Sequence, residues 1–301
     1  MLSYDVEKPK SSHSRLFRRL SGWPLLILPL FLFVMIVWRP ILVGISYSFF
    51  QLKGFQPEKF VGLLNFYDIL TDTTFLQTLW NTVLYVIWSL VIGLPLPIIA
   101  ALMLNEMIHA KEFFKFSLYI PCIIPAIAVS LIWKLMYLDG SGGMLNMFRS
   151  FLGLDPAMWL GNKNLVIPLI IISTCWNGFG STMIIYLASL QGINHELYEA
   201  TRLDGAGFLG RVMHVAYPHM RSLILLMTIR QIIGVFQIME QPLAMTGGGP
   251  NGASMSLGLT GYFYAFRLGQ FEKSIAVGVI SFVLMLGLTI VYVRTQKKFE
   301  I

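Results

Sequence analysis

The stretch "HELYEATRLDGAGFLGRVMHVAYPHM", residues 195–220, is polar in a chain that is otherwise mostly apolar. It contains two Glu, one Asp, two Arg and three His, although only 12% of the 301 residues are charged. Apolar runs of roughly membrane-spanning length lie on both sides of it. The stretch is therefore predicted to connect two transmembrane helices, and the rest of the sequence indicates on which side of the membrane it lies.

The composition is that of a membrane protein. Hydrophobic residues make up 56% of the chain, and the charged fraction is about half of the roughly 25% typical of soluble domains. The sequence predicts an all-α integral membrane protein with six transmembrane helices in a membrane domain over 23–294. The expected spans are 23–50, 79–104, 116–137, 164–190, 221–245 and 274–293.

The two ends of the chain are predicted to lie outside the membrane domain. The basic segment 1–22 resembles the start of a signal peptide, but no small-residue cleavage site follows it, so the first span is expected to be retained. Residues 295–301 form a short predicted tail.

The Lys and Arg distribution gives the orientation. Thirteen of the 22 Lys and Arg residues fall in segments on one side of the predicted spans, six fall on the other side, and three lie within spans. The positive-inside rule places both termini and the polar loop (192–220) in the cytoplasm. The Gly-rich stretches 138–146 and 246–254 are then expected outside.

The sequence lacks the motifs of several other functions. No Gly-Lys pair occurs, so the chain has no P-loop for ATP. Cys122 and Cys175 lie in apolar runs without metal-ligand spacing, so no metal site is predicted. The net charge of +7 follows the membrane segments, which argues against a nucleic-acid partner.

The local pattern of the polar loop predicts a helix, a glycine turn, a second helix and a proline bend. Asn194 is a candidate N-cap, and Gly205 is suited to end the first helix. Leu197, Ala200 and Leu203 form a short apolar stripe, while Glu199 can reach Arg202 at i+3. Pro218 is expected to bend the chain where it enters the membrane.

Three uses of this loop are open from the residues alone. It could lie on lipid headgroups, connect two spans, or dock a cytoplasmic partner. The narrow apolar stripe and the acidic residues beside it favour docking over an anionic membrane surface.

The segment "EATRLDGAGFLGRVMHVAYP" resembles the EAA loop of type I ABC importer permeases. The matching positions are Glu199, Ala200, Asp204, Gly205, Ala206, Val215 and Pro218; the chain differs at Thr201 and Tyr217. "FVGLLNFYDIL", "FLQTLWNTVLY" and "LAMTGGGPNGAS" followed by "YFYAF" are similar to segments of the branch that carries carbohydrates and glycerol phosphate.

The resemblance implies the type I ABC importer permease fold, a location in the cytoplasmic membrane of a bacterium or archaeon, and several partners. These are a second permease subunit, a dimer of ATP-binding subunits that bind ATP-Mg, and an extracytoplasmic solute-binding protein. It also implies that Glu199 contacts the ATPase and that Gly205 shapes the turn beside it. This chain itself is expected to bind no cofactor and to catalyse no reaction.

Polar residues within the spans suggest a solute pathway, since such residues usually face the bundle interior or a wet cavity. Gln237 and Gln241, at i and i+4, are expected on one face of the fifth span, with Glu240 and Arg230 nearby. Other candidates are Asn177, with aromatic surface from Trp176, Phe236 or Tyr186. The alternative is that these side chains only tie spans together.

Arg39 is deep in the first span and needs a partner or water, for which Glu240 is one candidate. Two further functions were weighed against an ATP-driven importer. An ion-coupled secondary transporter would need a carboxylate within the membrane, for which Glu240 is the candidate. A membrane scaffold would use the polar loop to recruit a cytoplasmic protein.

Overall fold

The computed structural model describes residues 23–299, which are mostly helical. Within this part of the chain, five helical stretches are long and apolar enough to cross a membrane, and a bent pair of helices supplies a sixth. The five are Leu26–Tyr47, Thr73–Glu106, Val166–Gln191, Phe208–Phe236 and Phe271–Arg294. The predicted all-α membrane fold is confirmed; residues 1–22 lie outside the described residues.

Several spans contain more than one helical segment. The first three consist of α2 (Trp23–Phe33), η1 (Val34–Trp38) and α3 (Arg39–Tyr47); α5 (Thr73–Trp88), η2 (Ser89–Gly93) and α6 (Pro95–Glu106); and α7 (Lys111–Tyr119), η3 (Ile120–Ile123) and α8 (Ala126–Met136). The last three are α10 (Val166–Gln191); α12 (Phe208–Arg211), η4 (Val212–Ala216) and α13 (Tyr217–Phe236); and α16 (Phe271–Phe299).

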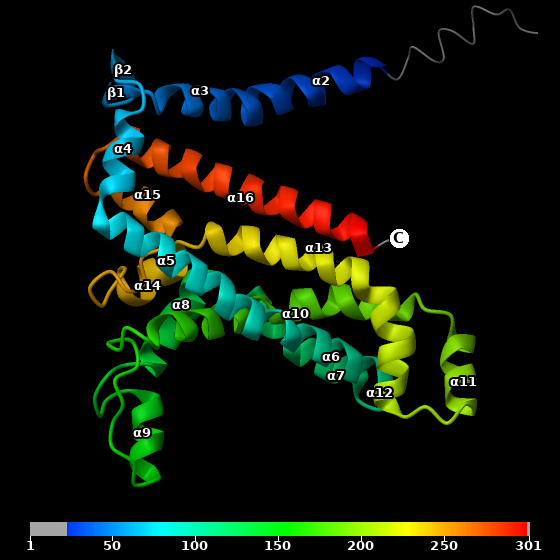
Figure 1. Ribbon diagram of the computed structural model, residues 1–301. Coiled ribbons are helices and arrows are strands. Elements are labelled where there is room, and N and C mark those ends of the chain that lie inside the picture. The colour runs from blue at the N-terminus through cyan, green and yellow to red at the C-terminus, as the bar shows by residue number, and fades with distance from the viewer. Residues whose placement is uncertain (1–22, 300–301) are drawn as a thin grey trace, which may run out of the picture.

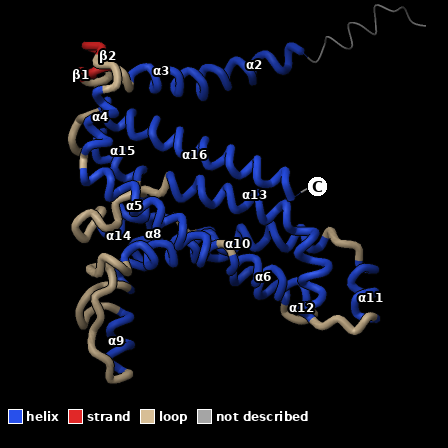
Figure 2. The backbone as a smooth tube through the Cα atoms, viewed as in Figure 1, coloured by secondary structure: helices blue, strands red, loops and turns tan. Residues whose placement is uncertain are grey.

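Shorter elements connect them. These are β1 (Phe50–Lys53), β2 (Gln56–Phe60), α4 (Leu64–Thr71), α9 (Met144–Phe151), α11 (His195–Leu203), α14 (Glu240–Thr246) and α15 (Leu257–Phe266). The two strands form an antiparallel hairpin in which Phe50 pairs with Phe60. Figure 2 shows that loops are concentrated at the two ends of the helix bundle.

The two ends of the molecule differ as the predicted topology requires. The strands, α4, α9 and α14 lie at one end, whereas α11 and α12 lie at the other, together with the start of α2 and the end of α16 (Figure 1). The polar loop is therefore on the same side as both described chain ends. The helix α16 continues to Phe299, so residues 295–299 are helical.

The third span is not the straight helix predicted over 116–137. Its two halves, Lys111–Ile123 and Ala126–Met136, meet at an angle of 96°. Pro125 causes the break, because the residue before a proline is driven out of the helical region, and Ile124 has ψ 130. Asn177 on α10 donates hydrogen bonds to the freed carbonyls of Pro121 and Ile124, at 2.7 and 3.2 Å.

The fifth span also ends earlier than predicted. The helix stops at Phe236 rather than continuing to 245, and α14 begins after a break at 237–239. The carbonyl of Ile238 accepts a hydrogen bond from Ser256, at the start of α15. A Cβ on Gly258 would lie 2.9–3.0 Å from the carbonyl oxygens of Ile238 and Gln237, so glycine allows α15 to pack on the break.

The polar loop is attached to the rest of the chain at the cytoplasmic end of α6. Tyr198, the buried residue of α11, is only 8% exposed and belongs to the core cluster that contains Leu104 and Leu187. Burial, followed by the Glu106 carboxylate, raises the pKa of the Tyr198 phenol, which keeps this group neutral.

Glu106 accepts a 2.7 Å charged hydrogen bond from Arg211 and lies 3.8 Å from Arg202. We call these three residues the Glu106 cluster. The predicted pairing of Arg202 with Glu199 is wrong: among the described ion pairs, Arg202 faces Glu106 across the loop. The first helix of the polar loop is therefore held to the second span by Tyr198 and Arg202, and α12 is held there by Arg211.

We predict that Gly180→Ala destabilises the protein. A Cβ at this position of α10 would lie 2.4 Å from the Leu118 carbonyl oxygen and 2.6 Å from the Tyr119 Cα, and backbone atoms can yield only by moving helices apart. The expected loss is about 1–3 kcal/mol, measured as a lower Tm of the purified complex. Gly178→Ala is the control, because nothing lies within 4 Å of its Cβ. Equal stability of the two variants would contradict the close approach.

We also predict that Glu106→Ala loosens α11. The side chain of Arg211 is only 15% exposed, so removing its partner leaves a mostly buried charge unpaired. Amide hydrogen exchange over residues 195–211 should accelerate roughly fivefold to a hundredfold. Glu112→Ala should have no such effect, since its pair with Lys115 is exposed. Unchanged exchange in Glu106→Ala would show that the cluster does not hold the helix.

Candidate functional site

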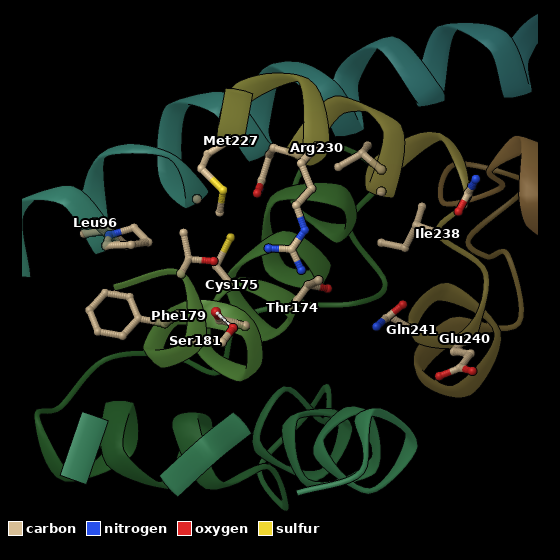
Figure 3. Close-up of a pocket in the computed structure, with 18 of the residues that line it drawn as sticks. Leu96, Thr174, Cys175, Phe179, Ser181, Met227, Arg230, Ile238, Glu240 and Gln241 are labelled. Atoms are coloured by element: carbon tan, nitrogen blue, oxygen red, sulfur yellow. Dashed lines mark hydrogen bonds between the residues drawn. The ribbon is translucent and has the colours of Figure 1, made fainter. Parts of the chain in front are cut away.

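A central cavity of about 500 Å³ opens between the second, fourth and fifth spans and α14. Figure 3 shows its labelled side chains converging from these elements. Its lining includes Gly93, Leu96, Pro97, Thr174, Cys175, Gly178, Phe179, Ser181, Thr182, Met227, Arg230, Gln231, Gly234, Gln237, Glu240 and Gln241. The volume falls in the range of small-molecule sites.

The break in the fifth span gives the cavity its polar wall. Arg230 and Gln231 project from α13, Gln237 is the first residue after that helix, and Glu240 and Gln241 open α14. Gln237, Glu240 and Gln241, which were predicted from the sequence, therefore line one cavity together with Arg230. Their predicted geometry is wrong, because Gln237 and Gln241 belong to different segments and do not share a helix face.

The fourth span supplies hydroxyl groups that the sequence prediction missed. Thr174, Ser181 and Thr182 line the cavity. Thr174 and Ser181 donate their hydroxyl protons to backbone carbonyls of α10, so each hydroxyl oxygen can still accept a hydrogen bond. The sequence does contain a signal for this face of the helix: Thr174, Gly178 and Ser181 are small or polar residues spaced at i, i+4 and i+7 in an apolar segment.

Space for the cavity depends on a small residue opposite this face. A Cβ at Gly93 would meet the Gln231 amide nitrogen at 2.6 Å and the Cys175 sulfur at 2.7 Å. Gly93 lies at the end of η2, where the second span changes from π-helical to α-helical turns. The absence of a side chain here leaves room for Gln231 and Cys175 on the cavity wall.

Four residues suggested for the solute pathway do not line the cavity. The Asn177 amide is occupied by the break in the third span. Trp176 is 39% exposed and stacks edge-on against Trp133, with ring centroids 5.9 Å apart. Phe236 is buried in a core cluster with Leu257 and Val277, and Tyr186, the other aromatic candidate, is fully buried beside Leu187.

The polar loop has the helix–turn–helix form predicted for it. Asn194 caps α11 by accepting a hydrogen bond from the Glu196 amide at 3.1 Å. At the other end the amides of Gly205 and Ala206 bond to the carbonyls of Arg202 and Thr201, and Gly205 has φ +76. This is a Schellman ending, which requires a left-handed residue and therefore favours glycine.

The loop exposes the side chains that the sequence singled out. Glu199, Ala200, Asp204 and Gly205 are all exposed at this end of the molecule. The predicted apolar stripe is exposed as well: Leu197 is half exposed and Leu203 is 89% exposed. These leucines are therefore accessible at the surface of the described chain, whereas Tyr198 on another face of α11 is buried.

Pro218 lies in the first turn of α13, directly after the π-helical turn η4. A proline cannot donate to the carbonyl four residues before it, and wider hydrogen bonds such as that from Tyr217 to Val212 replace the regular pattern. Figure 1 shows the chain turning between α12 and α13 at this point. The predicted bend is therefore produced by a π turn within a continuous helix from Phe208 to Phe236.

The first span makes few contacts within the chain. Its apolar window is entirely unburied, and Arg39 is exposed. The ion pairs of the described residues do not include one between Arg39 and Glu240, so the suggested partnership is not formed. Lys134, another basic residue within a predicted span, lies at the end of α8 and donates a hydrogen bond to the Ala244 carbonyl oxygen at 3.3 Å.

Comparisons with known proteins identify the family to which the chain belongs. The chain is 32% identical over 91% of its length to the trehalose/maltose transport system permease protein MalF of Thermococcus litoralis, of which it covers 92%. It is 32% identical over 93% of its length to the multiple sugar-binding transport system permease protein MsmF of Streptococcus mutans, of which it covers 96%.

A solved bacterial ABC transporter involved in the import of the acidic polysaccharide alginate has a chain of the same fold. Its TM-score is 0.83 at 22% identity, over 94% of this chain and 99% of that one. The family model described as the binding-protein-dependent transport system inner membrane component matches residues 78–301. The chain belongs to this family of ABC importer permeases.

Proposed function

We propose that this chain is a permease subunit of an importer that moves a sugar or oligosaccharide into the cytoplasm by alternating access. The observation that carries the proposal is the central cavity, in which amide and hydroxyl side chains are gathered within a membrane domain. Sugars are recognised through many hydrogen bonds, and these groups provide both donors and acceptors. The names of two relatives, which refer to trehalose/maltose and to multiple sugars, support the same substrate class.

The energy is proposed to come from ATP-binding subunits that dock on α11. Since the sequence has no P-loop, ATP-Mg would be bound by those partners. The exposed surface of Glu199, Ala200 and Leu203 at the cytoplasmic end is the proposed contact. A protein cleft would cover the apolar stripe that the chain itself leaves exposed.

The attachment of α11 explains how docking could move the cavity walls. Tyr198 and the Glu106 cluster connect α11 to α6, and α12 with η4 connects it to α13. Both α6 and α13 line the central cavity at their other ends. A displacement of α11 is therefore transmitted to two walls of the cavity, which can open it to alternate sides of the membrane.

A second permease subunit is proposed to complete the pathway, and a solute-binding protein to deliver solute at the opposite end of the molecule. Polar side chains such as Gln237 and Glu240 are exposed at the edge of the cavity in this chain alone. An exposed polar surface within the membrane region requires a protein or water neighbour instead of lipid. A related permease packed against this side would supply it.

We predict that Glu199→Ala lowers ATP-driven uptake at least tenfold. The importer is reconstituted in proteoliposomes with its partner permease, ATPase and binding protein, and uptake of labelled oligosaccharide is measured with ATP and with ATP plus vanadate. The variant should assemble, because the Glu199 side chain is exposed and no described ion pair uses it. The control is Glu112→Ala, an exposed carboxylate on α7, which should transport normally.

Uptake by this chain alone under an ion gradient would overturn the importer assignment in favour of a secondary transporter. Normal ATP-driven uptake by Glu199→Ala would be consistent with the importer assignment, but it would show that Glu199 is not needed for the contact with the ATPase.

We further predict that Gly205→Ala impairs uptake, and that the cause is strain in the backbone at residue 205 and not a steric clash. At φ +76 an alanine is strained by about 1–2 kcal/mol, although its Cβ would meet nothing within 4 Å. Gly205→Asn should retain more activity, because asparagine tolerates the left-handed region. Gly207→Ala is the matched control, since Gly207 has φ −66 and equal space. Equal transport by the three variants would show that the turn geometry is not needed.

A further inference from the structure

Arg230 places a permanent positive charge in the central cavity. It lies on α13, six residues before that helix ends, within the apolar stretch from Phe208 to Phe236. Arginine remains protonated at any physiological pH. An arginine at the centre of a spanning helix costs roughly 2.5–3.5 kcal/mol on insertion scales, so its position in a membrane helix requires water, a partner or a ligand.

The described part of the chain does not neutralise this charge. Among the described residues, the acidic members of the ion pairs are Glu106, Glu112 and Asp68, and no side-chain hydrogen bond comes from the Arg230 guanidinium. Figure 3 shows the guanidinium projecting into the middle of the cavity near Thr174 and Cys175. Glu240, the other charged residue in the lining, is at the edge on α14 and forms no ion pair with Arg230.

The chemistry of the guanidinium selects a type of ligand. Its planar donors fit the two oxygens of a carboxylate or phosphate, and such charge-assisted pairs are about twice as strong as neutral hydrogen bonds. A neutral solute that displaced the water around Arg230 would leave the charge desolvated without a compensating anion. A solute with a carboxylate or phosphate group supplies the compensating anion and so avoids the cost of desolvating the Arg230 charge.

We propose that the solute is an anionic saccharide and that Arg230 is the residue that selects its carboxylate or phosphate group. The inference rests on the proposed importer function and narrows its substrate class. The hydroxyls of the solute would lie against Gln231, Gln237 and Gln241. Glu240 repels the anion from the α14 edge, so the acidic group is directed toward Arg230.

The test compares anionic and neutral solutes in the complete importer. Proteoliposomes that contain both permeases, the ATPase and the binding protein are given trigalacturonate, its neutral methyl ester, glucose 6-phosphate or maltotriose. We expect the wild-type importer to take up trigalacturonate or glucose 6-phosphate in preference to both neutral sugars. Which of the two anions is preferred distinguishes a carboxylate from a phosphate substrate.

The variants then assign the selectivity to Arg230. Arg230→Gln should reduce uptake of the preferred anion roughly tenfold to a hundredfold and change residual neutral uptake by less than threefold. Arg230→Lys should retain part of the anion uptake, because it keeps the charge without the planar donors. Arg267→Gln is the control: this arginine lies over the Phe263 ring outside the central cavity and should not alter selectivity.

Two results would overturn the inference while the importer function stands. The first is preferential ATP-driven uptake of the neutral sugars by the wild-type complex, a result that needs no variant to fold. The second is equal loss of anionic and neutral uptake in both Arg230→Gln and Arg230→Lys, as expected if Arg230 pairs with an acid of the second permease. Absence of ATP-driven uptake of all four solutes would instead refute the proposed transport of saccharides.

Discussion

The structure depends on the requirement that backbone amides and carbonyls be hydrogen-bonded when they are in a membrane. Continuous helices meet it by themselves, but two spans of this protein are broken, and each break is stabilised by side chains from another element. Asn177 donates a hydrogen bond to a backbone carbonyl at the break in the third span, and Ser256 does the same at the break in the fifth. Non-helical backbone at this depth is tolerated only when it is enclosed in this way.

The break in the fifth span has a functional consequence. Had the helix continued to 245, Gln237 and Gln241 would have projected from one rod, with Glu240 beside them. The break turns α14 away from α13, so that Arg230 and Gln241 reach the same cavity from different elements. The loss of helical hydrogen bonds at 237–239 thus accompanies the formation of a polar site inside an apolar bundle.

The polar loop and the central cavity are connected by rigid elements. The core cluster around Tyr198, the Glu106 cluster and the helix from Phe208 to Phe236 join α11 to two cavity walls. Coupling through packed helices and buried ion pairs requires elements that move as units. Tyr198 is buried toward the spans, whereas the exposed face of α11 is the surface proposed to contact the ATP-binding subunits.

The sequence by itself determined the membrane class, the approximate position of the spans and the form of the polar loop. These follow from local properties: hydropathy over about 20 residues, the caps Asn194 and Gly205, and the distribution of Lys and Arg. The polar residues of the fifth span were also recognisable, because charged and amide groups are costly in lipid.

Only the tertiary structure decided which of these residues meet. The break at 237–239 depends on contacts with Ser256 and Gly258, about 20 residues away, and the pairing of Arg202 with Glu106 joins residues 96 positions apart. The roles of Asn177 and Trp176 were likewise set by neighbours on other spans. Local periodicity carries no information about such long-range partners, which is why the loop was predicted well and the cavity only in part.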